Sequence, residues 1–256
     1  MHRVVELKDV AIGYKACPVA THINATLAAG DFVALVGKNG AGKSTLLRTL
    51  AGYQQPLAGD ILYKGEPAGG MSAARMSKFV AVVLTENNAA LNLTVRELVA
   101  LGRSPYTNFV GHMRTADKER VEWAIEAVEI GVIAHRRVLS LSDGERQKCM
   151  IAKALAQETP VIMLDEPTAF LDFGSKVALF ALLKKLATEM NKAVLVSTHD
   201  IELALRVAGS LWLVDGGAVH CGTVDELSRS GALKRFVECD GVKFNEKNFT
   251  LEFSGR

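Results

Sequence analysis

The sequence predicts an α/β fold with a mostly parallel sheet, an antiparallel β section and an inserted helical region. Short apolar runs that suit strands buried on both faces occur at residues 32–36, 161–164 and 193–197. Helical patterns separate these runs, which is typical of parallel strands joined by crossover helices. Of the 256 residues, 49% are hydrophobic and 23% are charged. A chain of this length and composition is expected to bury a substantial core and not to be disordered.

The N-terminal part predicts antiparallel strands beside this core. Residues 3–7, 10–14 and 23–28 are short, bounded by turns and rich in β-prone side chains, and residues 59–65 have the same character. This section is therefore expected to form a small antiparallel β-subdomain.

The middle of the chain, from about residue 94 to residue 157, has mainly helical patterns. Residues 94–101 begin one amphipathic segment, and residues 116–129 form another. The second segment places four apolar side chains on one face, namely Val121, Ala124, Ile125 and Val128. These patterns predict a helical lobe inserted into the α/β core.

The whole chain, residues 1–256, is expected to be a single domain with three parts. Residues 1–85 and 158–217 are assigned to the core with its β section, and residues 86–157 to the helical lobe. A Gly-Gly turn at 216–217 precedes a C-terminal tail at 218–256. The tail mixes short helix and strand signals, which leaves open an accessory fold or an interface.

Composition also limits location and partners. No stretch approaches eighteen consecutive apolar residues, so neither a membrane-spanning helix nor an export signal is expected. The cysteines are widely spaced, which favours reduced thiols and a cytoplasmic location; they are Cys17, Cys149, Cys221 and Cys239. A formal charge of +2 gives no reason to expect a nucleic-acid partner, although it leaves a local basic patch open.

A phosphate-binding loop is predicted at residues 37–44, GKNGAGKS, directly after the apolar run 32–36. In such a loop, glycines let backbone N–H groups converge on a polyphosphate, Lys43 reaches the β- and γ-phosphates, and Ser44 ligates Mg²⁺. The alternative, a glycine-rich turn without a ligand, leaves the Lys-Ser pair unexplained. The expected ligand is a nucleoside triphosphate with Mg²⁺, bound by Gly37, Asn39, Gly40, Gly42, Lys43, Ser44 and Thr45.

Two carboxylates end the apolar run at residues 161–167, VIMLDEP, which matches a Walker B element. Phosphoryl transfer to water requires neutralised phosphate charge and a positioned nucleophile. Asp165 is assigned to the Mg²⁺ shell and Glu166 to the attacking water. A solvated acidic turn is the alternative, but the phosphate loop in the same domain argues against it.

His199 and Tyr14 are further candidates that depend on this context. His199 follows the apolar run 193–197, where an imidazole could reach a γ-phosphate at the carboxyl edge of the sheet. Tyr14 ends a strand candidate, where its ring could stack on an adenine. Taken alone, each residue also fits an ordinary structural role.

A second anion site is predicted at residues 141–147, LSDGERQ. Ser142 and Glu145 have the spacing of a capping box, so Ser142 is expected to begin a helix whose N-terminus attracts anions. A purely structural cap is the alternative from these residues alone. The LSxGxxQ pattern before the DE strand resembles the signature of ATP-binding cassette (ABC) proteins, and the ordered motifs from residue 4 to residue 217 fit that family.

This resemblance implies an ATPase in which two copies sandwich two ATP molecules head to tail. Ser142, Gly144 and Glu145 of one copy would then face the ATP held by the other. Residues 169–172, AFLD, resemble the D-loop, in which Asp172 links the two sites. The resemblance also makes His199 the switch histidine and Tyr14 the adenine-stacking residue.

Two positions depart from the family pattern. Members usually carry glutamine at the junction between core and helical lobe, where this chain has Glu86 as the best match and Thr85 as the alternative. A carboxylate there adds negative charge near the triphosphate, so hydrolysis or coupling is expected to differ. Asp143 replaces a commoner glycine of the signature, but Ser142 and Gly144 are retained.

The resemblance further indicates the ATPase subunit of an importer. Residues 94–106, TVRELVALGRSPY, resemble a stretch in subunits that import iron-siderophores, haem and cobalamin. The implied partners are integral membrane permease subunits and, indirectly, a substrate-binding protein, with this chain peripheral on the inner face of the cell membrane. The alternatives are a soluble ABC-type ATPase acting on nucleic acid or ribosomes, and a regulator that barely hydrolyses ATP. Glu166 and His199 argue against the regulator.

Overall fold

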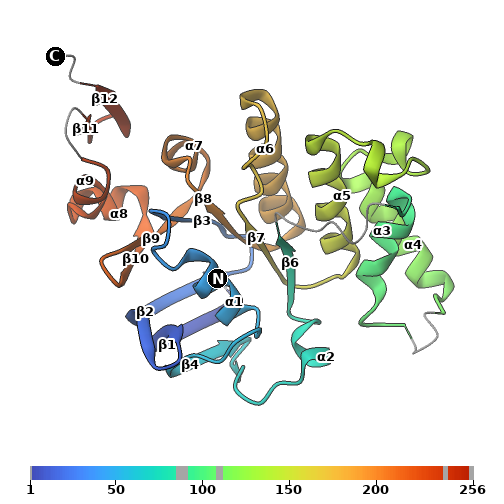
Figure 1. Cartoon of the computed structure of the whole chain (residues 1–256), viewed down its shortest axis with the longest axis horizontal. Coiled ribbons are helices and arrows are strands. Elements are labelled where there is room, and N and C mark those ends of the chain that lie inside the picture. Colours follow the sequence, from blue (N-terminus) through green and yellow to red (C-terminus); the bar gives the residue numbers. More distant parts are fainter. Residues whose placement is uncertain (1, 85–91, 108–111, 239–241, 254–256) are drawn as a thin grey trace.

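A six-stranded sheet forms the centre of the molecule (Figure 1). The structure, a computed structural model, describes residues 2–84, 92–107, 112–238 and 242–253. The strands are β3 (Phe32–Gly37), β6 (Val80–Leu84), β7 (Val161–Asp165), β8 (Ala193–Thr198), β9 (Ser210–Asp215) and β10 (Ala218–Thr223). Their order is β10-β9-β3-β8-β7-β6, and all pairs are parallel except β10 with β9. The predicted parallel core is confirmed.

A four-stranded antiparallel sheet lies beside it, in the order β2-β1-β4-β5 (Figure 1). Its strands are β1 (Arg3–Tyr14), β2 (Cys17–Ala28), β4 (Ala58–Tyr63) and β5 (Glu66–Pro67). The sequence predicted separate strands at 3–7 and 10–14, but β1 is continuous. Its pairing with β2 shifts register between Leu7 and Val10, and Asp9 in that gap has a φ of 50°. A β-bulge therefore absorbs the polar residues that seemed to interrupt the strand.

The predicted helical lobe is also present, on the right of Figure 1. Its elements are α3 (Val95–Ala100), the 3₁₀ turns η2 (Leu101–Arg103), η3 (Gly131–Ile133) and η4 (Val138–Ser140), α4 (Thr115–Ala127) and α5 (Asp143–Ala156). The four apolar residues predicted to share a face of the second segment are all buried. Thr94 begins α3 with a capping box, in which its hydroxyl accepts from the Glu97 amide and the Glu97 carboxylate accepts in return.

The remaining helices cover the sheet or follow it. They are α1 (Lys43–Leu50), α2 (Ala73–Met76), α6 (Phe173–Met190), α7 (Ile201–Val207), α8 (Val224–Arg229) and α9 (Ala232–Val237). A hairpin of β11 (Val242–Asn245) and β12 (Thr250–Phe253) comes last. Among the described residues, no helix is both long and apolar enough to cross a membrane.

The central strands separate two hydrophobic cores. In β3, Val33 and Leu35 face α1 and the antiparallel sheet, whereas Phe32, Ala34 and Val36 face the core shared with α5 and α6. Strands β7 and β8 alternate in the same way. Because both faces are covered, these strands are apolar throughout, which is why their sequence is a continuous hydrophobic run.

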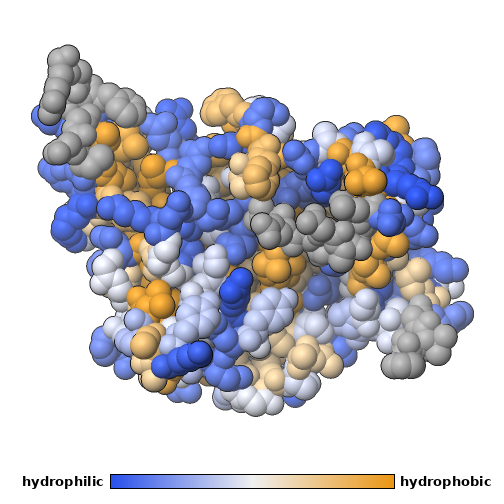
Figure 2. Space-filling view, viewed as in Figure 1, coloured by the Kyte–Doolittle hydropathy of each residue, from blue (hydrophilic) through white to orange (hydrophobic). Residues whose placement is uncertain are grey.

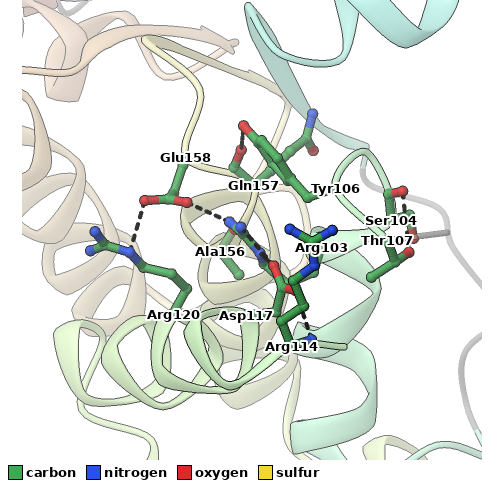
Figure 3. Close-up of polar contacts among 10 residues, drawn as sticks. All are labelled: Arg103, Ser104, Tyr106, Thr107, Arg114, Asp117, Arg120, Ala156, Gln157 and Glu158. Atoms are coloured by element: carbon green, nitrogen blue, oxygen red, sulfur yellow. Dashed lines mark hydrogen bonds and ion pairs between the residues drawn. The ribbon is translucent and has the colours of Figure 1, made fainter. Parts of the chain in front are cut away.

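A buried ion pair holds α4 against the turn that follows α3 (Figure 3). The Arg103 guanidinium donates from Nε to Asp117 Oδ1 at 3.0 Å, and both side chains are less than 10% exposed. The backbone N–H of Arg114 also donates to Asp117, at 3.0 Å. That hydrogen bond, followed by the contact with Arg103, holds the pKa of Asp117 below its usual range.

We predict that Asp117→Asn lowers the free energy of unfolding by about 3 kcal/mol at pH 7, because it removes one of the two carboxylates that pair with the buried Arg103 guanidinium. The stabilisation depends on ionised Asp117. It is therefore complete above the ordinary aspartate pKa of about 3.9 and is lost as the pH falls through the lower folded-state pKa. Urea unfolding of both proteins at several pH values measures the difference, which should stay constant down to about pH 4.5 and then narrow. A difference already absent at pH 6 contradicts the assignment.

Candidate functional site

The loop between β3 and α1 is shaped by two glycines with positive φ. Gly40 has a φ of 77°, and Gly42, the residue before α1, has a φ of 111°. A Cβ atom on Gly42 would lie 2.5 Å from Cγ1 of Val19, so space as well as conformation requires glycine. The loop ends at the N-terminus of α1, whose free backbone N–H groups favour an anion.

Lys43 begins α1, and its side chain is buried. Its ammonium donates to the carbonyl oxygen of Gly37 at 2.9 Å and to that of Lys38 at 3.3 Å. It also lies 3.7 Å from Oε1 of Glu166. Burial lowers the pKa of Lys43, while the carboxylates of Glu166 and Asp165 oppose that shift. The loop thus fixes one positive charge within reach of both acidic side chains.

The two carboxylates predicted from the DE pair stand at the end of β7. Oδ1 of Asp165 accepts from the hydroxyl of Ser197 at 2.7 Å, and that hydroxyl accepts from the backbone N–H of Glu166 at 2.8 Å. Ser197 is fully buried in β8, so the neighbouring strand fixes both acidic residues. Ser197 had no predicted role, although a hydroxyl within a buried apolar strand is a signal in the sequence that could have identified it.

Glu166 and His199 are in direct contact. Nε2 of His199 lies 2.5 Å from Oε1 of Glu166, and Nδ1 of the same ring lies 3.5 Å from the Lys43 ammonium. Glu166 has a φ of 48°, which a non-glycine residue rarely adopts. Backbone strain of this kind is concentrated at functional sites. The pairing of β3 with β8 and of β8 with β7 therefore brings together the ammonium, imidazole and carboxylate that were predicted separately from the sequence.

Tyr14 lies beside the start of α1. Its phenol oxygen accepts from the hydroxyl of Thr45 at 3.4 Å, and this contact lowers its pKa. The side chain is 48% exposed, so one part of the ring is available to a ligand. The hairpin between β1 and β2 thus brings Tyr14 to the phosphate loop despite their separation in sequence.

Ser44 and Asp165 supply the oxygen ligands that Mg²⁺ prefers. Within the described residues, no three side chains of His, Cys, Asp or Glu group closely enough to form a metal site of their own. Mg²⁺ is typically bound by one or two carboxylates together with phosphates and water, so a hydroxyl and a carboxylate beside a phosphate loop fit that ion.

The second predicted anion site begins α5, and the predicted capping box is confirmed. The Ser142 hydroxyl accepts from the backbone N–H of Glu145 at 3.3 Å, and Glu145 Oε2 accepts from the backbone N–H of Ser142 at 2.9 Å. The Ser142 backbone N–H, followed by the Ser142 hydroxyl, donates to the Glu145 carboxylate and lowers the pKa of Glu145. Asp143 follows in the first turn and pairs with Arg146 at 3.2 Å, which leaves the cap intact.

A cavity of about 300 Å³ lies between this end of α5 and the start of α6. Ser142, Gly144 and Ser175 contribute to its lining. Asp172 begins α6 by accepting from the Ser175 backbone N–H at 2.9 Å, which lowers the pKa of Asp172. The predicted signature and D-loop segments, about thirty residues apart in sequence, are therefore adjacent in the fold.

The structure thus brings together one group of predicted residues at the carboxyl edge of the sheet and a second group at the start of α5 and α6. The group at the carboxyl edge of the sheet is Tyr14, Gly37, Asn39, Gly40, Gly42, Lys43, Ser44, Thr45, Asp165, Glu166 and His199. Glu86 and its alternative Thr85 lie outside the described residues.

Comparison with known proteins agrees with this arrangement. A family model described as ABC transporter matches residues 20–169, more than half of the chain. The petrobactin import ATP-binding protein FpuC of Bacillus anthracis is 36% identical over 205 residues, which cover 80% of this chain and 75% of the relative. The iron(3+)-hydroxamate import ATP-binding protein FhuC of Bacillus subtilis is 32% identical and covers 91% of this chain and 87% of its own length.

A solved structure supports the same conclusion. It is the dimeric structure of an ATP-binding cassette in a post-hydrolysis state, bound to ADP and Pi. It is 28% identical, covers 86% of this chain and 98% of its own, and has a TM-score of 0.73. The chain belongs to the ABC transporter family and is one of its ATP-hydrolysing subunits.

Proposed function

We propose that this chain powers the import of an iron chelate, haem or a cobalamin-like molecule through separate membrane subunits. The observation that carries this proposal is the similarity to FhuC, an iron(3+)-hydroxamate import protein, along 91% of this chain. The similarity to FpuC, a petrobactin import protein, points to the same class of cargo. The cargo itself would contact the membrane subunits and, before them, a substrate-binding protein.

In the proposed reaction, ATP and Mg²⁺ bind at the carboxyl edge of the sheet. Lys43 and the N-terminus of α1 neutralise the β- and γ-phosphates. Ser44 and Asp165 would hold Mg²⁺, which would supply positive charge to offset the charge that develops during phosphoryl transfer. Glu166 orients the attacking water and accepts its proton, and His199 holds the Glu166 carboxylate in place through their 2.5 Å contact.

We infer that the active unit is a head-to-tail dimer of this chain. Ser142, Gly144 and Glu145 belong to a cavity separate from the phosphate loop, so a second copy would bring them to its partner's ATP. Phe170 and Phe173, beside Asp172, are 74% and 76% exposed. Apolar side chains gather at the upper end of α6 in Figure 2, and burying them between two copies would favour association.

A groove of about 340 Å³ between core and helical lobe is the proposed docking site for the membrane subunits. Its apolar lining includes Tyr53, Met71, Met76, Leu101, Pro105 and Met150. Flexible methionines suit a groove that receives an apolar helix. Lys153 also lines it, and burial lowers the pKa of this side chain, so an acidic group on the docking segment would complement it. Docking here would place the chain peripherally on the cytoplasmic face of the membrane.

We predict that Glu166→Gln lowers Mg²⁺-dependent ATP hydrolysis at least 100-fold, the usual contribution of a general base, while ATP binding is retained. The measurement is the hydrolysis rate of the purified chain as a function of its concentration. The parental rate should rise more steeply than the concentration, because two copies form the site. The variant should instead accumulate an ATP-bound dimer, detected by size-exclusion chromatography. Hydrolysis at the parental rate refutes the role of Glu166.

We predict that Lys43→Ala weakens ATP binding about 10- to 100-fold, because charge-assisted hydrogen bonds to phosphate are worth about 1.5–3 kcal/mol. Titration with a fluorescent ATP analogue measures this change. The exposed Lys185, on α6, supplies a control in Lys185→Ala, which removes a positive charge away from the loop. Equal losses in both variants would mean that overall charge, and not the loop, determines affinity.

We predict that Leu101→Asp detaches the chain from its membrane subunits, because it places a carboxylate in the groove. The affinity-tagged chain, expressed in its native host, is recovered from solubilised membranes, and the co-purifying membrane-spanning subunits are quantified. Val132→Asp is the control, since Val132 is 87% exposed and lies outside the groove lining. Equal recovery of membrane subunits with Leu101→Asp and the parental chain contradicts docking in this groove.

A further inference from the structure

The segment LGRSPY, residues 101–106, packs closely against the last turns of α5. A Cβ atom on Gly102 would lie 2.2 Å from the carbonyl oxygen of Lys153, so only glycine allows this approach. The next residue, Arg103, is 5% exposed. A fully charged side chain is rarely buried to this extent unless every donor has a partner, so its contacts require an explanation.

Arg103 joins three elements of the helical lobe (Figure 3). Its Nη1 donates to the carbonyl oxygen of Ala156 at 2.7 Å, at the end of α5, and to Glu158 Oε2 at 2.6 Å. Its other nitrogens bind Asp117 at the start of α4. Arg120, also on α4, binds the second oxygen of Glu158 at 2.9 Å. The planar guanidinium satisfies these partners at once, which an ammonium cannot do.

The contacts around Arg103 also extend to the core. The ring of Tyr106 stacks on the Arg103 guanidinium, with 4.1 Å between its centroid and Cζ, and its hydroxyl donates to the Gln157 carbonyl at 3.0 Å. The Gln157 side chain donates to the carbonyl oxygens of Ser77 and Val80, at 2.6 and 3.0 Å. The C-terminal end of α5 is therefore tied to the start of β6 through its own last residues and through Arg103.

We propose that Arg103 is a positioning residue that sets the direction of α5 and thereby the place of Ser142 and Gly144 at its other end. With 14 residues, α5 is about 21 Å long, so a tilt of about 6° at the fastened end moves Ser142 by about 2 Å. A displacement of that size is enough to break a hydrogen bond. The contribution to hydrolysis rests on the proposed dimer, in which Ser142 meets the ATP of the second copy.

The first test measures a distance between the helical lobe and the core, and it requires neither ATP nor a dimer. Spin labels are attached at Asp143→Cys, in the first turn of α5 beside Ser142, and at Lys185→Cys on α6, two exposed positions. The labelled chain has serine in place of Cys17, Cys221 and Cys239. Arg103→Lys keeps the charge but removes the planar fork. We expect a single narrow distance distribution for the parental chain and a broader or shifted one for Arg103→Lys.

A matched control is Arg96→Lys, because Arg96 forms an exposed ion pair with Glu122 in the same lobe, at 2.7 Å. Among the described residues, the guanidinium of Arg96 makes no ion pair or hydrogen bond with α5. This variant should keep the parental distribution. If Arg103→Lys is unfolded by circular dichroism, Tyr106→Phe replaces it, since that variant keeps the stacked ring and removes only the donor to Gln157. A folded variant at Arg103 or Tyr106 with the parental distance distribution overturns the proposal.

The second test separates positioning from general damage. Affinity for a fluorescent ATP analogue should change less than about twofold in Arg103→Lys, because the phosphate loop belongs to the core. The kcat of ATP hydrolysis should fall about tenfold with little change in KM. An equal loss of affinity and kcat indicates a merely structural role and overturns the proposal. If the parental chain does not hydrolyse ATP, the proposed function fails, whereas the distance measurement still decides the role of Arg103.

Discussion

The parallel pairing of β3, β8 and β7 is the constraint on which the rest of the site depends. Val36 pairs with Thr198, and Leu164 pairs with Val196, so the three strands end at nearly the same level. Each strand is followed at once by chemically active residues: the phosphate loop, His199 and the acidic pair. The phosphate loop is more than a hundred residues from the acidic pair and from His199 in sequence. The register of the sheet therefore brings the Lys43 ammonium, the His199 imidazole and the Glu166 carboxylate within 4 Å of one another.

Burial on both faces gives this register its rigidity. The strands are apolar on either side, so a shift by one residue would exchange the two cores and is strongly disfavoured. Ser197 is the polar exception within β8, and its hydroxyl fixes both Asp165 and the Glu166 amide. Such support is what allows Glu166 to keep a positive φ, which costs roughly 1–3 kcal/mol elsewhere in a protein.

Local sequence patterns predicted the parallel core, the helical lobe and the capping box of Ser142, because each is encoded within a few neighbouring residues. They missed what depends on distant partners. The polar residues near Asp9 suggested a break in β1, but pairing with β2 continues across a bulge. Ser197 is an ordinary strand residue until β7 lies beside it. The buried contacts of Arg103 with Asp117 and Glu158 require α4 and α5 to be folded already, so residues 94–106 predicted an amphipathic segment and an importer resemblance but not these contacts.

If the membrane subunits dock in the proposed groove, the placement of α5 would let this one helix contact both the nucleotide and the membrane partner. Its capped N-terminus presents Ser142 and Gly144, whereas Met150, Lys153 and Ala154 line the groove in its second half. The turn held by Arg103 contributes Ser104 and Pro105 to the same groove. A segment entering the groove would therefore press on the fastened end of α5, and a rigid helix would carry that displacement to the signature. Because Arg103 holds the C-terminal end of α5 tightly, a force applied there would tilt the helix and displace Ser142 at its N-terminal end. A loosely held helix would instead shift as a whole.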